Sequence, residues 1–258
     1  MLKAAISGQQ VRNSHALVVD GIGKAIVGGA YAQGSILPGD PELARLFEVS
    51  RTVLREAMKT LAAKGMLVAK ARIGTRVTDR STWNYFDSDV LRWHLENGVD
   101  RIFLGHLREM RMSFEPYAAR LACQRANASD VARMYAQAQA MAEATSQEAF
   151  AIADLDFHMA LLEASKNPFM YSVGALIEAA LVTSFRLSSP FGEAQRQSNT
   201  ASKHRFIAEA IEAQDAEVAA AAVVAVIEEG TRRLDSAISD REIPTDNGRS
   251  DKPAEHPS

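Results

Sequence analysis

Apolar residues recur every three or four positions along most of this chain, which is the spacing of helices with one buried face. In the first third, the pattern predicts a helix at about 16–27 that stops at a pair of glycines. Two further amphipathic segments, at about 41–48 and 51–64, are separated only by Val49 and Ser50. Helices joined by so short a connection must cross at an angle, which predicts a helix-turn-helix.

Two short segments with strand character follow this pair of helices. Gly65 ends the second helix, and residues 66–70 and 75–78 then read as two strands around a turn. A hairpin placed directly after a helix-turn-helix predicts a winged helix-turn-helix over residues 15–79. We expect residues 1–14 to form a flexible N-terminus.

The remaining chain has helical periodicity without a convincing strand, and a polar and aromatic linker at 80–97 leads into it. We expect an all-helical domain over 98–240 and a disordered tail at 241–258, where Pro, Asp, Asn, Gly and Ser dominate. The fold class is therefore mainly α, an N-terminal winged helix-turn-helix followed by a C-terminal all-α helical bundle. The pattern places the helices at about 87–97, 101–126, 129–144, 147–165, 168–189, 199–213 and 215–238.

Charge is divided unequally between these two parts. The whole chain has 29 Lys and Arg against 32 Asp and Glu, a net charge of −3 that read alone argues against a nucleic-acid protein. Residues 1–80, however, hold 12 basic and 6 acidic residues, so the net charge of the remainder is −9. The single cysteine, Cys123, excludes an intramolecular disulfide, and no apolar stretch suits a signal peptide or a membrane span, so we expect a cytoplasmic protein without membrane contact.

The second helix of the helix-turn-helix has one face suited to DNA. Arg51, Thr52, Arg55 and Lys59 lie opposite its apolar stripe, and Ser50 is placed to cap it. An arginine fork can pair with guanine in the major groove while hydroxyls and lysines contact phosphates. A charge stripe alone is more typical of a solvated helix face. The preceding helix and the basic wing, with Arg72 and Arg76, make DNA binding the better interpretation.

A longer series of residues resembles the winged-helix domain of the GntR family of bacterial transcription regulators. The residues are, in order, Gly34-Ser35-Ile36-Leu37-Pro38, Glu42-Leu43-Ala44, Val49-Ser50-Arg51-Thr52-Val53-Leu54-Arg55-Glu56-Ala57, Leu61, Gly65 and Gly74-Thr75-Arg76-Val77. The resemblance implies that Ser50, Arg51, Thr52 and Arg55 face DNA, and that Gly74 lets the wing tip enter the minor groove. This chain has Pro41 where relatives often carry a polar residue, and Arg45, one turn further on, is a candidate to replace that contact.

Asp154 and His158 are the first candidate metal ligands in the helical part. They are four residues apart, on one face of a helix, and His204 opens a later helix. This spacing permits a shared metal ion, although an isolated Asp–His pair is more often a hydrogen-bonded pair without metal.

The helical part resembles the effector domain, called FCD, of the FadR subgroup of the same family. The resemblance is carried by Glu109-Met110-Arg111, Glu115-Pro116, Ala118-Ala119, Asp154, Phe157-His158, Asn167-Pro168, His204, Ala210-Ile211, Asp215 and Ala219. It implies a divalent ion, of the zinc, nickel or manganese class, held by an Asp and three histidines and binding a small organic acid. Val226 stands where the last histidine is expected. Either the three ligands Asp154, His158 and His204 suffice, or the effector is bound without metal.

The effector itself is expected to be a small carboxylate. Arg111 lies where relatives that sense organic acids keep an arginine toward the pocket, and a guanidinium can pair with a carboxylate through two bonds. From the sequence alone, a salt bridge with Glu115 or Glu109 explains Arg111 equally well. Ser184 and Arg186 are weaker candidates for the same site.

The linker, from Trp83 to Trp93 with Leu95-Glu96-Asn97 following, resembles that of regulators of sugar-acid catabolism of the galactonate type, which also lack the last histidine. Its aromatic residues, Trp83, Tyr85, Phe86 and Trp93, are expected to pack the winged helix onto the helical domain. The resemblance implies a homodimeric repressor, not an enzyme, that binds palindromic double-stranded operator DNA and releases it when a sugar acid binds. Two alternatives stay open: a metal-dependent helical hydrolase or isomerase, and a regulator of another organic or fatty acyl acid.

Overall fold

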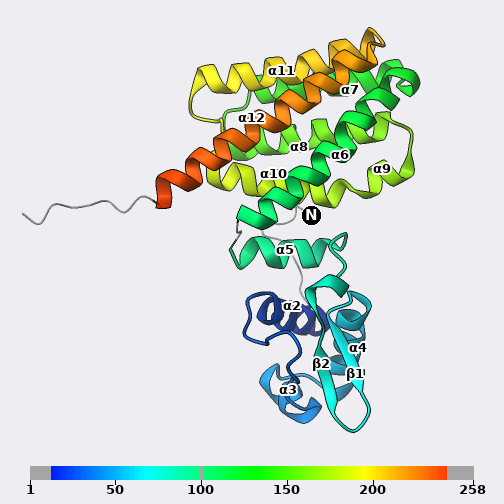
Figure 1. Ribbon diagram of the computed structural model, residues 1–258, viewed down its shortest axis with the longest axis vertical. Coiled ribbons are helices and arrows are strands. Elements are labelled where there is room, and N and C mark those ends of the chain that lie inside the picture. Colours follow the sequence, from blue (N-terminus) through cyan, green and yellow to red (C-terminus); the bar gives the residue numbers. More distant parts are fainter. Residues whose placement is uncertain (1–12, 99–100, 243–258) are drawn as a thin grey trace, which may run out of the picture.

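The first helices of the chain form a helix-turn-helix. The computed structural model describes residues 13–98 and 101–242, apart from a few side chains. It begins with α2 (Ser14–Val27), α3 (Asp40–Leu46) and α4 (Arg51–Ala63), which lie in the lower part of Figure 1. The side chain of Asn13 caps α2 by accepting from the Ala16 amide, and Ser50 caps α4 by accepting from the Val53 amide at 3.3 Å. The predicted capping role of Ser50 is thus confirmed.

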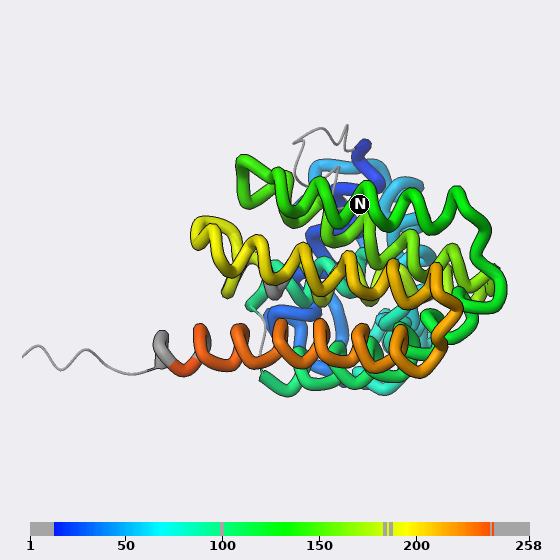
Figure 2. Tube along the Cα trace, turned by 90° about the horizontal axis from the view of Figure 1, so that it is seen from above, coloured from blue at the N-terminus to red at the C-terminus, as the bar shows by residue number. Residues whose placement is uncertain are grey.

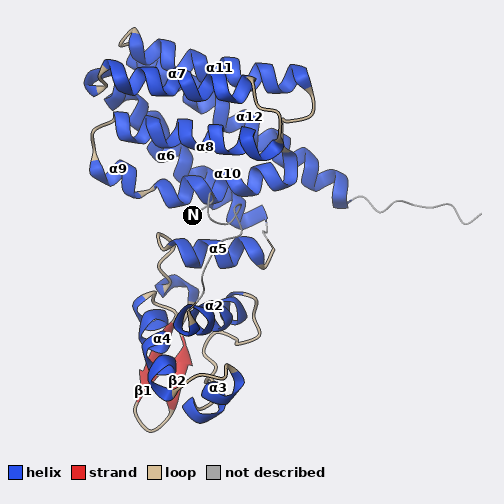
Figure 3. Cartoon of the chain, turned by 180° about the vertical axis from the view of Figure 1, so that it is seen from behind, coloured by secondary structure: helices blue, strands red, loops and turns tan. Residues whose placement is uncertain are grey.

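A two-stranded hairpin completes this domain as its wing. Strands β1 (Leu67–Lys70) and β2 (Gly74–Val77) are antiparallel, with Leu67 opposite Val77. They are the red arrows of Figure 3, which shows no other strand in the described part of the chain. The segment before α3 extends the hairpin, because the Gly34 amide donates to the Val77 carbonyl at 2.9 Å. The wing is therefore fixed on one side and free at its turn.

The linker forms a helix that belongs to both cores. After a short 3-10 turn, η1 (Arg80–Thr82), comes α5 (Ser88–Glu96), which packs against α2 on one side and α10 (Gly174–Ser188) on the other. Trp83 and Trp93 are buried in the core of the N-terminal domain, whereas Leu91 belongs to the core of the helical domain. Phe86 was expected to pack, but its side chain is 54% exposed. The linker aromatics therefore attach mainly to the winged helix.

The rest of the chain is a bundle of helices, and all of them agree in type with the sequence pattern. Figure 2 shows the long helices side by side from above, with the N-terminal domain behind them. Their bounds are α6 (Arg101–Arg125), α7 (Ala128–Ala142), α8 (Gln147–Ala164), α9 (Pro168–Ser172), α10, α11 (Ala194–Glu212) and α12 (Ala216–Glu242).

Three boundaries differ from the prediction by more than two residues, and one of them is the end of α12, which lies at Glu242 and not at 238. The single helix expected at 168–189 is two helices, α9 and α10, separated at Val173. Val173 between them is buried, and Ser172 and Gly174 flank it, so a polar residue and a glycine mark the break in the sequence. Helix α11 starts at Ala194, five residues earlier than the expected 199, because its first turn is polar and carries no hydrophobic period. The expected termini, 1–14 and 241–258, lie largely outside the described residues.

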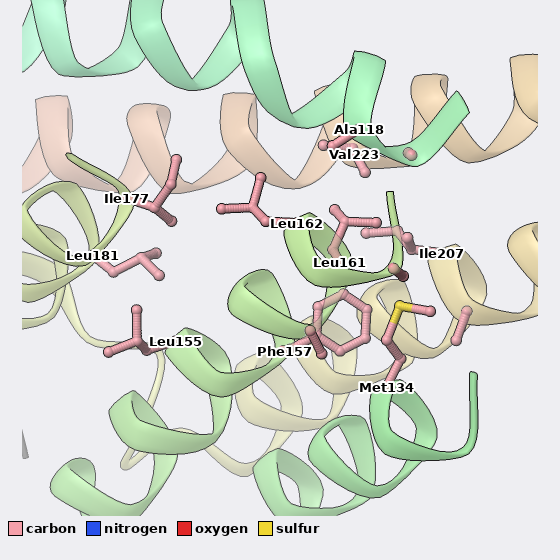
Figure 4. Close-up of a cluster of buried hydrophobic side chains, with 14 of the residues drawn as sticks. Ala118, Met134, Leu155, Phe157, Leu161, Leu162, Ile177, Leu181, Ile207 and Val223 are labelled. Carbon is pink, nitrogen blue, oxygen red and sulfur yellow. The ribbon is translucent and has the colours of Figure 1, made fainter. Parts of the chain in front are cut away.

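Helix α8 forms the centre of the bundle. Its residues Phe157, Leu161 and Leu162 are fully buried, and Figure 4 shows them meeting side chains of the surrounding helices. Both faces of α8 are apolar, as expected for a helix enclosed by others. Asp154 and His158 are among the buried residues of α8, so their polar atoms must find partners inside the bundle. In the described part of the chain, no helix has the length and apolar character needed to cross a membrane.

Candidate functional site

Helix α4 presents the predicted cationic face to solvent. Leu54, Ala57 and Leu61 are buried against the domain, which turns the opposite side outward. All the residues predicted to contact DNA are exposed, namely Arg45, Ser50, Arg51, Thr52, Arg55, Lys59, Arg72, Gly74 and Arg76. Four of them, Arg51, Thr52, Arg55 and Lys59, share α4, and Arg45 lies on α3.

The intramolecular contacts of these cations are weak. Arg55 Nε lies 3.7 Å from Asp40 Oδ2, and Lys59 pairs with Glu56 at 2.8 Å, all on exposed side chains. Exposed pairs of this kind contribute little, so a phosphate or base can replace the protein partner. Arg51 has no ion pair in the described part of the chain, which leaves its guanidinium available for base contact.

The wing carries two of the predicted cations with different roles. Arg72 lies at the turn with a positive φ of 64°, and Gly74 follows with a φ of 121°. A side chain at a φ near 120° is strained, which explains the glycine there. Arg76 Nε donates to the Gly34 carbonyl at 2.9 Å, so it also ties the wing to the segment before α3.

Asp154, His158 and His204 come together inside the bundle. Asp154 and His158 lie on α8 and His204 on α11, and all three are buried. His204 Nε2 lies 3.1 Å from Asp154 Oδ1 and 3.3 Å from His158 Nε2. One ligand atom from each of the three residues lies within 4.8 Å of the others, so the group is close enough to hold a metal ion. The three candidate ligands thus meet from two helices.

The two histidines are oriented by groups behind them. His204 Nδ1 lies 2.8 Å from the Thr200 carbonyl, which can only accept, so Nδ1 donates its proton there and Nε2 faces Asp154 and His158. His158 Nδ1 lies 2.6 Å from Glu115 Oε2. Such partners are typical behind metal-bound histidines, because they fix the ring and raise its basicity.

Arg111 forms a buried pair with Glu115. Its Nε donates to Glu115 Oε1 at 2.5 Å, and its Nη2 lies 3.4 Å from His158 Nε2. Arg111 therefore does pair with Glu115, but as a buried pair beside His158 and not as the salt bridge of a solvated surface. Burial raises the pKa of Glu115, but Arg111 and His158 outweigh it and lower that pKa to about 2. Glu115 is thus an anion.

Asp154 is also held as an anion. Burial raises the pKa of its carboxyl, yet His204, His158 and Arg111 together lower the pKa below its ordinary value. A deprotonated carboxylate beside two imidazole nitrogens is a donor set that suits zinc, nickel or manganese.

These residues line a small cavity between α6, α8, α11 and α12. Its volume is about 30 Å³, which is room for about two water molecules. Val226, Phe150 and Phe185 form apolar parts of its wall. Val226, where the resemblance led us to expect a histidine, thus lies at the site but offers no ligand atom.

Three lining residues were not foreseen from the sequence. Lys203 pairs with Glu229, and Glu229 accepts from Arg233 Nη1 at 3.1 Å. Burial lowers the pKa of Arg233. The signal for Lys203 in the sequence is its place beside His204. Glu229 and Arg233 follow Val226 by one and two helical turns, which was the available clue.

Two predicted effector residues cannot be placed at this site. Ser184 and Arg186 lie on α10, but their side chains are outside the described residues. Their neighbour Phe185 does line the cavity.

The two sites are connected through α5. Its residue His94 stacks on Phe103 of α6 with ring centroids 4.8 Å apart, and Tyr85 lies 5.4 Å from the same imidazole. Helix α6 then carries Arg111 to the cavity. A packed path of aromatic side chains therefore joins the winged helix to the helix that lines the cavity.

An exposed cationic helix-turn-helix with a wing, attached to a helical bundle that encloses a charged cavity, defines a winged-helix transcription regulator. Residues 16–77 match the bacterial regulatory proteins of the gntR family, and residues 106–229 match the FCD domain. The chain belongs to the GntR family. Regulators of this family bind operator DNA and small-molecule effectors, so the chain is a DNA-binding regulator and not an enzyme.

Curated relatives of the chain are regulators as well. The galactonate operon transcriptional repressor of Escherichia coli (strain K12) is 35% identical over 84% of this chain and 95% of its own length. The probable D-xylose utilization operon transcriptional repressor of Paenarthrobacter nicotinovorans is 27% identical over 73% of this chain and 76% of its own. The Listeria monocytogenes protein Lar has the same fold, with a TM-score of 0.60 at 21% identity over 88% of this chain and 99% of its own.

Proposed function

We propose that this protein is a dimeric, cytoplasmic repressor of a sugar-acid catabolic operon, and that a galactonate-like acid releases it from its operator. The observation that carries the proposal is the buried group of Asp154, His158 and His204 beside Arg111, in a chain whose other domain exposes a cationic recognition helix. Similarity to the galactonate operon repressor of Escherichia coli supports the class of acid.

The DNA-binding part is residues 15–79. Arg51 and Arg55 of α4 read bases in the major groove, while Ser50, Thr52 and Lys59 contact phosphates. The wing, with Arg72 and Gly74, reaches the neighbouring minor groove. One such domain binds weakly, so two copies related by two-fold symmetry bind the two halves of a palindrome.

A divalent metal ion fits the effector site. Asp154 Oδ and the Nε2 atoms of His158 and His204 would hold it, and Thr200 and Glu115 already orient the histidines. Some FCD domains bind metal ions. When bound, the ion supplies positive charge that attracts the effector carboxylate. Three protein ligands leave coordination positions open, since Val226 contributes none.

Arg111 gives the effector a second electrostatic anchor. Its guanidinium is held by Glu115, and its Nη2 faces His158. A carboxylate near His158 would therefore meet Arg111 as well, in a site from which bulk water is largely excluded.

Effector binding is coupled to DNA binding through the linker at 80–97. The effector domain, 98–240, contacts α5 through α10 and through the stacking of Phe103 on His94. An effector releases DNA only if it binds the DNA-free arrangement more tightly. A movement of α6 at Arg111 would act on α5, and α5 in turn holds the winged helix.

The alternatives receive less support. The charged residues that line the cavity, among them Arg111, Asp154 and Glu229, do not suit a fatty acyl chain. The curated relatives named above are transcriptional repressors, which does not favour a hydrolase or isomerase.

The proposal is tested by operator binding with the purified full-length chain. DNA from upstream of its own coding sequence is titrated by fluorescence anisotropy, with and without D-galactonate and with added zinc, nickel or manganese. Coupling energies of about 1–3 kcal/mol predict that saturating acid weakens operator binding roughly 5–150-fold.

Galactose is the matched control ligand, because it keeps the hydroxyl groups but lacks the carboxylate, and it should leave operator binding unchanged. Operator binding that no sugar acid alters would contradict the proposal. Release by galactose itself would contradict the role of the carboxylate.

A further inference from the structure

A second and larger cavity lies on the other side of Arg111, between α6 and α12. Its volume is about 220 Å³, about seven times the volume of about 30 Å³ beside the histidines. Arg111 and Gly230 line both cavities. The two helices lie side by side in Figure 1 and pack directly on each other. A ligand anchored at the histidines therefore has its nearest large space here.

Two glycines keep this space open. Gly105 on α6 and Gly230 on α12 both line the cavity. A Cβ atom at Gly105 would have no neighbour within 4 Å, and one at Gly230 would approach only Arg233 Nη2, at 3.8 Å. Glycine in a helix interior costs about 1 kcal/mol relative to alanine. No backbone conformation requires glycine at either position, since both are helical with negative φ.

Arg108 is a cation without a partner in this cavity. Its Nε is buried and donates no hydrogen bond, and in the described part of the chain its side chain forms no hydrogen bond or ion pair. The other charged residues that line this cavity have partners or face solvent. Arg111 pairs with Glu115, and Arg101 donates to Ser239 Oγ at 3.2 Å. The side chain of Asp235 is exposed. A half-buried guanidinium that lacks an anion is costly unless an anion is supplied.

We propose that this cavity is a second anion subsite and that Arg108 binds the anion. The effector is then a sugar acid with two anionic groups, one carboxylate at Asp154, His158, His204 and Arg111, and a second carboxylate or a phosphate at Arg108. The inference rests on the proposed function, because it assigns the far end of the same effector. The apolar walls, including Leu107 and Ile227, strengthen the charge interaction by excluding water.

The test is calorimetric titration of the purified full-length protein with three compounds that share one carbon skeleton. They are a six-carbon aldonate, the aldarate with the same hydroxyl configuration, and the 6-phosphate of the aldonate. We expect at least one of the two dianions to bind at least tenfold more tightly than the aldonate. Preference for the aldarate or for the phosphate identifies the second group.

Variants of Arg108 separate the two subsites. Arg108→Ala should remove the preference for the dianion while changing aldonate affinity less than twofold, and Arg108→Lys should keep part of the preference. Arg120→Ala is the control, since Arg120 links the same two helices through Glu217 but is exposed and outside the cavity.

The outcomes distinguish this inference from the proposed function. Equal binding of all three compounds, or equal weakening of all three by Arg108→Ala, overturns the second subsite and leaves the sugar-acid regulator standing. Failure of all three to bind overturns both.

Discussion

The indole Nε1 of Trp93 donates a hydrogen bond to Asp20 Oδ1 at 2.8 Å, in the interior between α5 and α2. Arg92 Nη1 also lies 2.7 Å from Asp20 Oδ1, so two neighbouring residues of the linker helix bind the same carboxylate. Lys24 of α2 then reaches Glu96 at 2.7 Å. The linker helix is thereby fixed to the first helix of the DNA-binding domain, and a movement of α5 must carry that domain with it.

Gly23→Ala tests how closely α5 is packed on α2. A Cβ at Gly23 would lie 2.4 Å from the nearest atom of the Trp93 ring, so the ring or the helix must shift. Overpacking of this kind costs about 1–3 kcal/mol, partly offset by the better helix propensity of alanine. We expect a net loss of about 1 kcal/mol in the free energy of unfolding, measured by urea denaturation.

Gly105→Ala is the matched control for that substitution, since its Cβ would meet no atom within 4 Å. It should stabilise the protein by about 1 kcal/mol. Stabilisation by Gly23→Ala of the same size would show that α5 does not pack on α2 as described.

Asp20 makes stability depend on pH in the acid range. Burial raises the pKa of its carboxyl, but Trp93, Arg92 and Lys24 together lower it to about 2, against 3.8 ordinarily. A lowered folded-state pKa gives stability that is present above about pH 4 and is lost as the pH falls through 2. We expect the wild-type protein to exceed Asp20→Asn by about 2 kcal/mol in free energy of unfolding at pH 7.

That difference should shrink as urea denaturation is repeated from pH 4 down to pH 2. Glu209→Gln is the control, because Glu209 forms an exposed pair with Arg205 and should contribute less than about 1 kcal/mol at any pH. If the stability difference between the wild-type protein and Asp20→Asn stays constant down to pH 2, the negative charge of Asp20 does not stabilise the fold, and the difference comes from packing alone.

Helix α4 and the histidine group show what the sequence determines locally. Leu54, Ala57 and Leu61 repeat at helical spacing, so the exposed face of α4 follows from the sequence. Asp154 and His158 share a face of α8 for the same reason. Both are relationships within one helix, where a residue's direction depends on spacing alone.

Relationships between helices could not be read in this way. The contact of Glu115 with His158, and the place of Arg233 on the cavity wall, depend on how α6, α8 and α12 cross. Family resemblance identified the ligand set, but it gave no indication of the partners behind it.

Arg51→Ala tests the assignment of α4 as the recognition helix. Arg51 is exposed at the first position of α4. Loss of a bidentate contact to a base should cost about 1–3 kcal/mol in binding to the operator but little on scrambled DNA. Fluorescence anisotropy on both sequences measures the difference.

Lys59→Ala serves as the comparison. Loss of a phosphate contact should weaken binding to both DNA sequences alike and reduce the salt dependence of binding. If Arg51→Ala weakened binding to operator and to scrambled DNA equally, Arg51 would contact the phosphate backbone of the DNA and not a base.

His204→Ala tests the metal ion. Protein purified without chelator should contain about one divalent ion per chain by elemental analysis, and His204→Ala should contain little, since only Asp154 and His158 remain. Because metal binds the folded state, a chelator should lower the Tm of the wild-type protein and not of the variant.

His15→Ala is the control for nonspecific binding of metal ions to histidines. His15 contacts Thr60 in the N-terminal domain and belongs to no group of candidate metal ligands in the described part of the chain. Wild-type protein without any divalent ion, even after incubation with zinc, nickel and manganese, would end the metal hypothesis.

The Arg111–Glu115 pair requires a variant that separates structure from effector binding. Arg111→Ala would leave the carboxylate of Glu115 buried with only His158 beside it, and breaking a buried pair costs about 3–5 kcal/mol. Loss of induction in that variant could then reflect unfolding. Replacing both partners, as in Arg111→Met with Glu115→Gln, removes the two charges together and should cost much less.

We expect the double variant to remain folded and bind the operator, because neither residue lies in the DNA-binding domain. It should lose release by the sugar acid, since the guanidinium that meets the carboxylate is gone. Glu115→Gln alone would leave Arg111 as a buried cation without its carboxylate partner, so it should be destabilised as Arg111→Ala is. Release is measured by anisotropy, and folding by a circular dichroism melt. If the double variant is folded and still leaves the operator at the same effector concentration as the wild-type protein, Arg111 does not belong to the effector site.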